Sequence, residues 1–145
     1  MTTQVKKDEN IEDLKEAILS NENKKSYNSS IFEAIEKKVK IALEDQNADD
    51  ALITITRWAL ELKASDIHYE VKENHIDLRF RIDWILVTLF SMEAKYYKIL
   101  LERLKYESSL KLNITDIPQD WKYSKILEWK KIDVRVSTIP TKYWE

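Results

Sequence analysis

The sequence predicts an α+β fold, with one mainly antiparallel sheet of five strands and helices packed on one face of that sheet. Apolar and polar side chains alternate in two runs between residues 64 and 89 and again along residues 131–139, which is typical of half-buried strands. Apolar residues recur at helical spacing in residues 51–63 and 92–106. The expected order is therefore α-β-β-β-α-β-β, preceded by short N-terminal helices.

The first two alternating runs are expected to form an antiparallel hairpin around the polar turn at residues 72–75. The second run places four apolar side chains on one face: Ile76, Leu78, Phe80 and Ile82. On the outer face, the possible registers place acids against arginines. Either Asp66 or His68 would face Arg81. Glu70 would face Arg79. A third strand is expected at residues 85–90.

The remaining elements follow from spacing and capping signals. Short amphipathic helices are expected at residues 11–19 and 31–43, with a polar linker at residues 21–30 and Ser30 as a cap. Asp49 or Asp50 would cap the helix at residues 51–63. Strands at residues 122–127 and 131–139 would form a second hairpin around residues 128–130. The acidic run at residues 44–50 suggests a boundary between a helical N-terminal segment, residues 1–48, and a domain at residues 49–145.

Composition excludes several classes of protein. The 145 residues contain 24 Lys plus Arg against 26 Asp plus Glu, a net charge of -2. This balance argues against a nucleic-acid partner bound through bulk charge. The chain has no cysteine, which excludes disulfides and thiolate metal sites and suits the cytosol. No apolar run approaches the length of a membrane span, so we expect a soluble protein.

Glycine is absent from the chain, although average usage of about 7% would give roughly ten residues. Four of the five tryptophans stand at turn-like sites where glycine is expected: Trp84, Trp121, Trp129 and Trp144. Trp58, in a helical pattern, fits less clearly. One hypothesis is that these tryptophans stand at UGA codons that the source organism reads as glycine. The alternative is an ordinary glycine-poor protein with genuine tryptophans.

Catalytic and metal-binding motifs are weak in this chain. No GxxxxGK[ST] phosphate loop exists, even with glycine restored at the tryptophans. Asp66, His68 and Glu70 share a strand face and are zinc-competent, but facing arginines would repel a cation, which favours structural ion pairing. A general acid or base role for His68 or His75 is disfavoured, because the sequence shows no nucleophile that either histidine could activate. The tyrosines at helical spacing are expected in the core: Tyr96, Tyr97 and Tyr106.

Three arginines are the remaining candidates for a functional site. Arg79, Arg81 and Arg135 each alternate with apolar residues, so all three are expected on the polar face of the same sheet. They could form surface ion pairs worth under about 1 kcal/mol each. The pattern alone favours such ion pairs; the alternative is an anion site, because guanidinium groups match phosphate oxygens.

Four segments together resemble the motifs of one family. They read ASDIHYE at residues 64–70, RFRIDW at 79–84, IPQDWKYS at 117–124 and IDVRVSTIPTKYWE at 132–145. These are similar to ASDIH, RxRxDG, PQDG and DxRVSTxPTxxGE of the N-terminal domain that precedes the motor core of type II secretion and type IV pilus assembly ATPases. The resemblance covers residues 48–145. Family glycines correspond to Trp84, Trp121 and Trp144, and the turn at Trp129 is commonly glycine.

The resemblance implies a PAS-like domain in a cytoplasmic, homohexameric ATPase, peripheral to the inner membrane, that couples ATP hydrolysis to pilin or pseudopilin assembly. Its partners would be its own motor core, the neighbouring subunits and an inner-membrane platform protein. ATP and Mg²⁺ would bind the full-length protein and not this chain alone, because the family's Walker motifs would lie beyond Glu145. The chain alone should therefore be inactive.

The resemblance also implies that Arg135, in the DxRVST motif, contacts nucleotide phosphate held by the motor core. Arg81 is the next candidate and Arg79 the third. The alternative function is a stand-alone PAS-like interaction module without ATPase activity. The sequence does not distinguish secretion from pilus extension or retraction.

Overall fold

The computed structural model describes residues 24–143, and the side chains from Ser30 onward. The expected helix at residues 11–19 and Trp144 lie outside the described residues. The elements are α2 (Lys24–Glu44), α3 (Ala48–Glu61), β1 (Asp66–Val71), β2 (Ile76–Ile82), β3 (Ile85–Met92), α4 (Ala94–Glu107), β4 (Gln119–Leu127) and β5 (Lys130–Thr138). The predicted α+β class and the element order from α3 onward are confirmed.

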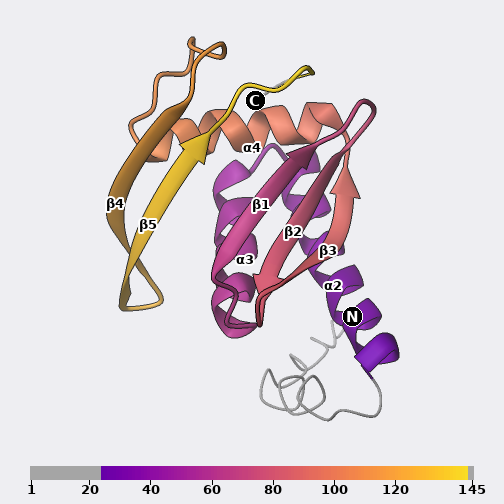
Figure 1. Cartoon of the computed structure of the whole chain (residues 1–145). Helices are drawn as coiled ribbons and strands as arrows, with labels where there is room; N and C mark the ends of the chain where they lie inside the picture. Colours follow the sequence, from indigo (N-terminus) through magenta and orange to yellow (C-terminus); the bar gives the residue numbers. More distant parts are fainter. Residues whose placement is uncertain (1–23, 144–145) are drawn as a thin grey trace, which may run out of the picture.

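The strands form two antiparallel sheets, β1-β2-β3 and β4-β5, so the prediction of a single five-stranded sheet is wrong. Alternation of side chains shows which face of a strand is buried but does not say which strands pair, and this explains the error. Figure 1 shows the β4–β5 hairpin beyond the β1 edge of the larger sheet. Ion pairs tie it to the helices: Arg57 of α3 binds Glu128, and Lys125 binds Glu107 of α4 at 2.7 Å.

The larger sheet has the predicted inner face. Ile76, Leu78 and Phe80 are buried, and Phe80 is 0% exposed. They form one core with apolar residues of α2, α3 and α4, and Figure 1 shows these helices behind the sheet. Val134 of β5 is half-buried. The packing of helices on one face of the sheet is therefore as predicted.

Helix boundaries differ from the prediction, most clearly at the starts of α2 and α3. Helix α2 already begins at Lys24, so Ser30 lies inside it and the linker prediction is wrong over residues 24–30. The cap of α3 is Asn47, whose side-chain oxygen accepts from the Asp50 amide at 3.1 Å. Asp49 and Asp50 lie in the first turn instead, where the helix dipole favours carboxylates. Residues of α2 and α3 pack in the same core. The proposed domain boundary at residue 48 stays a prediction.

Both hairpin turns between long strands have left-handed backbone at two successive residues. The φ angles are 48° at Asp83 and 69° at Trp84, then 48° at Glu128 and 67° at Trp129. Two positive φ values in a two-residue loop define a type I′ turn, in which glycine is the preferred second residue. The two tryptophan side chains are 91% and 98% exposed. This geometry supports the glycine hypothesis at both positions.

Trp121 does not share that geometry. It lies within β4 opposite Val136, and its φ is not positive. The expectation of a turn at Trp121 is therefore wrong, because the residue lies within a paired strand.

Candidate functional site

The three candidate arginines lie on two different sheets. Arg79 and Arg81 are on β2, whereas Arg135 is on β5 of the separate hairpin. The prediction that all three emerge from one sheet is wrong, because the predicted sheet is divided. The candidates therefore have to be judged as two sites.

Arg79 is held within the larger sheet by a carboxylate. Its Nη1 donates to Glu70 Oε2 at 2.7 Å, and its buried Nε has no hydrogen-bond partner among the described residues. Glu70 also binds Lys72, and the hydrogen bonds from Lys72 and then Arg79 lower the pKa of Glu70. His68 lies directly opposite Arg79, and Glu70 reaches the arginine diagonally. These contacts indicate a structural ion pair.

Arg81 is similarly engaged. Asp66 is its register partner and approaches Arg81 Nε at 3.2 Å. Arg81 Nη1 also donates to the Trp84 carbonyl at 3.4 Å, which ties the guanidinium to the β2–β3 turn. Asp66 thus faces Arg81, as one of the predicted registers had it, whereas Glu70 lies opposite Asp77 and not opposite Arg79 as predicted. Within residues 24–143, no three histidine, aspartate or glutamate side chains gather where they could hold a metal ion.

Arg135 differs from both in its exposure and in the form of its contact. Its side chain is 63% exposed. Arg135 Nε lies 3.0 Å and 3.2 Å from the two Asp120 oxygens, and Nη2 lies 2.6 Å from Oδ2. The hydrogen bond from Arg135 lowers the pKa of Asp120, and the same contact raises the pKa of Arg135. Both groups are therefore charged at neutral pH.

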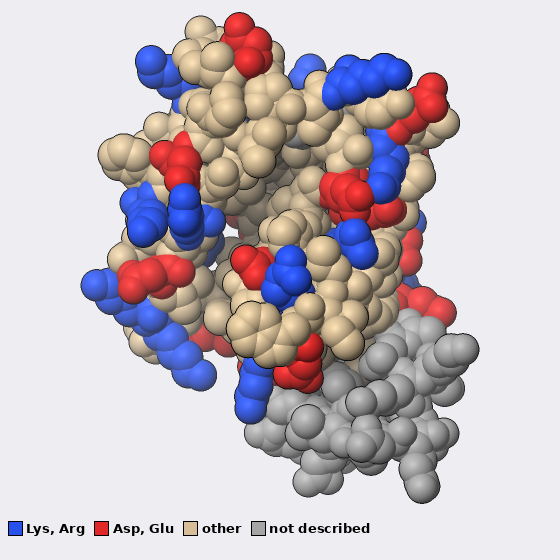
Figure 2. Space-filling model, in the orientation of Figure 1, with Lys and Arg blue, Asp and Glu red and all other residues tan. Residues whose placement is uncertain are grey.

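A hollow of about 440 Å³ lies over the same hairpin. Its lining comprises Lys122, Tyr123, Ser124, Asp133, Val134 and Arg135. Lys122 lies directly opposite Arg135 in the register, so two cationic side chains share one face of the hairpin. In Figure 2, basic and acidic groups alternate along the hairpin. The lining combines these two cations with the carboxylate of Asp133, and the exposed Arg135 guanidinium is the group in it best suited to bind a phosphate oxygen.

The loop before β4 is fixed by Gln119, whose importance the sequence did not indicate. Its Nε2 donates to the carbonyls of Lys111 and Ile114, both at 3.0 Å, and its Oε1 accepts from the Lys111 amide at 2.8 Å. The buried Lys105 donates to the Ile114 carbonyl at 3.0 Å. The PQDW segment thus has two structural tasks: Gln119 fixes the loop, and Asp120 holds Arg135.

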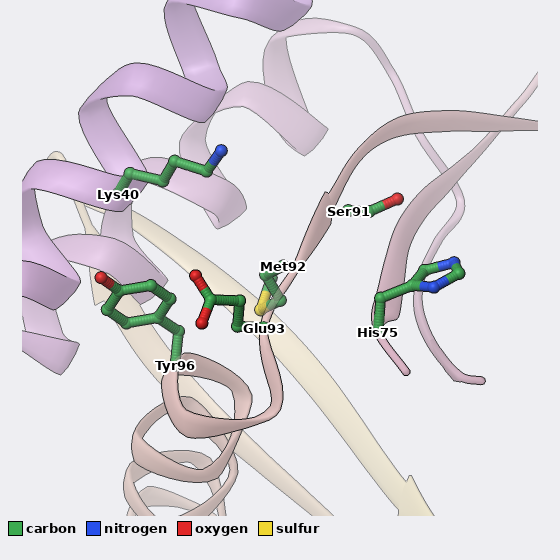
Figure 3. A pocket seen from close by; sticks show the side chains of 6 residues that line it. All are labelled: Lys40, His75, Ser91, Met92, Glu93 and Tyr96. Carbon is green, nitrogen blue, oxygen red and sulfur yellow. The ribbon is translucent and has the colours of Figure 1, made fainter. Parts of the chain in front are cut away.

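A smaller cavity of about 170 Å³ lies between α2, the sheet and the start of α4. Figure 3 shows Tyr96 and Glu93 side by side, with Lys40 approaching from α2 and His75 on the other side. Its lysine is paired, because Lys40 binds Glu36 at 2.5 Å, and His75 Nε2 lies 3.3 Å from Asp77 Oδ1. Glu93 adds a negative charge. The hairpin brings together two basic side chains, Lys122 and Arg135, whereas this cavity has one, Lys40, so the hairpin is the stronger candidate for an anion.

Comparison with known proteins identifies the family. A family model described as "Type II/IV secretion system protein" matches residues 42–145, more than half of the chain. The chain belongs to this family. The match includes the β-sheet, the hairpin and Arg135, so the candidate site lies in the part of the chain that is shared with the type II/IV secretion system family.

Three relatives show how the chain corresponds to whole proteins. It is 38% identical over 87 residues to "Type II secretion system protein E" of Klebsiella pneumoniae, which covers 60% of the chain and 18% of that protein. It is 34% identical to "Type II secretion system ATPase E" of Vibrio cholerae, over 60% of the chain and 17% of that protein. It is 34% identical to "Type II secretion system protein E" of Pseudomonas aeruginosa, over 66% of the chain and 20% of that protein. The chain thus spans about a fifth of the length of these relatives.

Among the described helices, none is long and apolar enough to cross a membrane.

Proposed function

We propose that this chain is the N-terminal part of a secretion or type IV pilus assembly ATPase, in which the β4–β5 hairpin presents Arg135 to the phosphates of ATP. The observation that carries the proposal is the exposed guanidinium of Arg135, set opposite Lys122 over a hollow of about 440 Å³. The name of the Vibrio cholerae relative, an ATPase, supports the nucleotide as the anion.

The chemistry follows from the charge of the nucleotide. Phosphoryl transfer builds negative charge on the γ-phosphate oxygens, and an arginine placed there stabilises it. ATP and Mg²⁺ are held by a motor core outside this chain, and Arg135 reaches them across a domain or subunit boundary. Arg81 is the second candidate for this contact. Arg79 is the third, because its Nη1 already binds Glu70 at 2.7 Å within the sheet.

The wider proposal concerns the assembly. The protein is a homohexamer at the cytoplasmic side of the inner membrane, whose domain movement acts on a platform protein to assemble pilins or pseudopilins. The contacts of this chain are with its own motor core and the neighbouring subunits. The segment at residues 1–48 connects this domain toward the membrane complex.

Two experiments test the proposal. The first reads the gene beyond codon 145: a continuing frame with a P-loop supports the motor, whereas a stop codon there favours a stand-alone PAS-like interaction module.

The second experiment measures ATPase activity of the full-length hexamer with Arg135→Ala and, separately, Arg135→Lys. We expect turnover to fall by on the order of 10³ for the alanine variant, with an unchanged thermal midpoint. The lysine variant should recover only a part, because an ammonium group lacks the fork geometry. Full turnover in both variants would show that Arg135 is an ordinary surface residue.

A further inference from the structure

The contact between Asp120 and Arg135 uses only one edge of the guanidinium. Asp120 accepts from Nε and Nη2, and no described residue accepts from Nη1. An arginine has five N–H donors in a rigid fork. The edge formed by Nη1 and the second proton of Nη2 is therefore available for another acceptor while Asp120 stays bound.

The backbone fixes where this pair lies. Asp120 is opposite Ser137, and Arg135 is opposite Lys122, so the carboxylate reaches the arginine diagonally across one face of the hairpin. The pairing of β4 with β5 holds the two Cα atoms in place. Asp120 can thus restrain a long side chain without any contribution from a loop.

The other two arginines lack this arrangement. Arg79 uses Nη1 for Glu70 and has a buried Nε without a described partner. Arg81 contacts one Asp66 oxygen through Nε and a carbonyl through Nη1. Of the three candidates, Arg135 alone combines a carboxylate on Nε and Nη2 with a side chain that is 63% exposed.

We infer that Asp120 is a positioning residue, which holds one edge of the Arg135 guanidinium so that the opposite edge faces a nucleotide phosphate. This inference rests on the proposed function of Arg135. A free arginine side chain loses considerable rotamer freedom when it binds, and a side chain already restrained by a second group loses less. Asp120 stays bound during the contact and is not displaced by the phosphate.

The first test uses this chain and needs no nucleotide. In an NMR spectrum, the Nε–H group of Arg135 should be ordered in the native chain and mobile in Asp120→Asn. The control is Asp49→Asn, which removes a comparable exposed pair, since Asp49 Oδ1 lies 2.5 Å from Arg103 Nε. An equally ordered Arg135 side chain in Asp120→Asn would overturn the inference.

The second test uses ATPase kinetics of the full-length hexamer. Asp120→Asn should lower kcat about tenfold, by analogy with the loss seen when a group that orients a metal ligand is removed, and Asp120→Glu should restore part of it. In the Arg135→Ala background, Asp120→Asn should have no further effect. Asp49→Asn should keep full turnover.

The outcomes separate the two proposals. If Arg135→Ala reduces turnover but Asp120→Asn does not, the positioning role is wrong and the proposed function stands. If Asp120→Asn tightens ATP binding or raises turnover, Asp120 competes with phosphate, and the inference is overturned. If Arg135→Ala is fully active, the proposed function itself fails.

Discussion

Replacing Trp84 and Trp129 by glycine should stabilise the fold. Left-handed backbone costs a residue with a Cβ about 1–2 kcal/mol, so relief at both turns is worth roughly 2–4 kcal/mol. Each glycine returns about 0.5–1 kcal/mol through the greater freedom of the unfolded chain. The side chains are 91% and 98% exposed, so little packing is lost. Two glycines together cost about 1–2 kcal/mol, so the net gain for the double variant is about 1–2 kcal/mol, which raises the thermal midpoint by roughly 2–8 °C.

The assay is thermal unfolding of the chain and of its Trp84→Gly, Trp129→Gly and double variants, followed by circular dichroism. Trp58→Gly is the matched control, because Trp58 lies inside α3 and packs partly against the core. That variant should lose stability. Equal or lower stability of the double variant would refute the strain argument. Codons provide a separate test of recoding: UGA at positions 84 and 129 agrees with it, and UGG contradicts it.

Three further predictions concern the core, the hairpin and activity. Phe80→Ala should lower the free energy of unfolding by about 3–5 kcal/mol, because the side chain is 0% exposed; a denaturant titration showing under about 1 kcal/mol would contradict the core assignment. Burial, and then Glu107, raises the pKa of Tyr123 to about 12. Because the unfolded tyrosine ionises near about 10, stability should fall as pH rises from about 10 to 12, and Tyr123→Phe should remove this component in alkaline unfolding curves. The purified 145-residue chain should hydrolyse no ATP, because its sequence contains no phosphate loop; turnover abolished by a point change within it would refute this.

Alternation along the strands predicted the inner face of the larger sheet. The burial of Leu78 and Phe80 and the position of Arg81 opposite Asp66 follow from period-two spacing and a short polar turn. The division into two sheets could not be predicted in this way, because strands with the same alternation can pair with any suitable edge.

The candidate site was predicted in part. Alternation correctly placed Arg135 on the polar side of its strand, and the motif resemblance selected it. The pairing with Asp120 was missed, because it depends on the register of β4 against β5, which the turn at Glu128 and Trp129 sets. One available signal was the Asp of the PQDW segment, which lies on an alternating strand that faces the arginine strand. The role of Gln119 could not be predicted, since its partners are backbone groups of an irregular loop.

The proposed contact between Arg135 and nucleotide phosphate is tested most directly by a structure of the full-length protein with Mg²⁺ and a non-hydrolysable ATP analogue. We predict that the Nη1 and Nη2 edge of Arg135 lies within hydrogen-bonding distance of a phosphate oxygen, while Asp120 still binds Nε. A nucleotide bound in a closed motor core, with Arg135 in solvent and more than about 3.5 Å from every phosphate oxygen, would contradict the proposal.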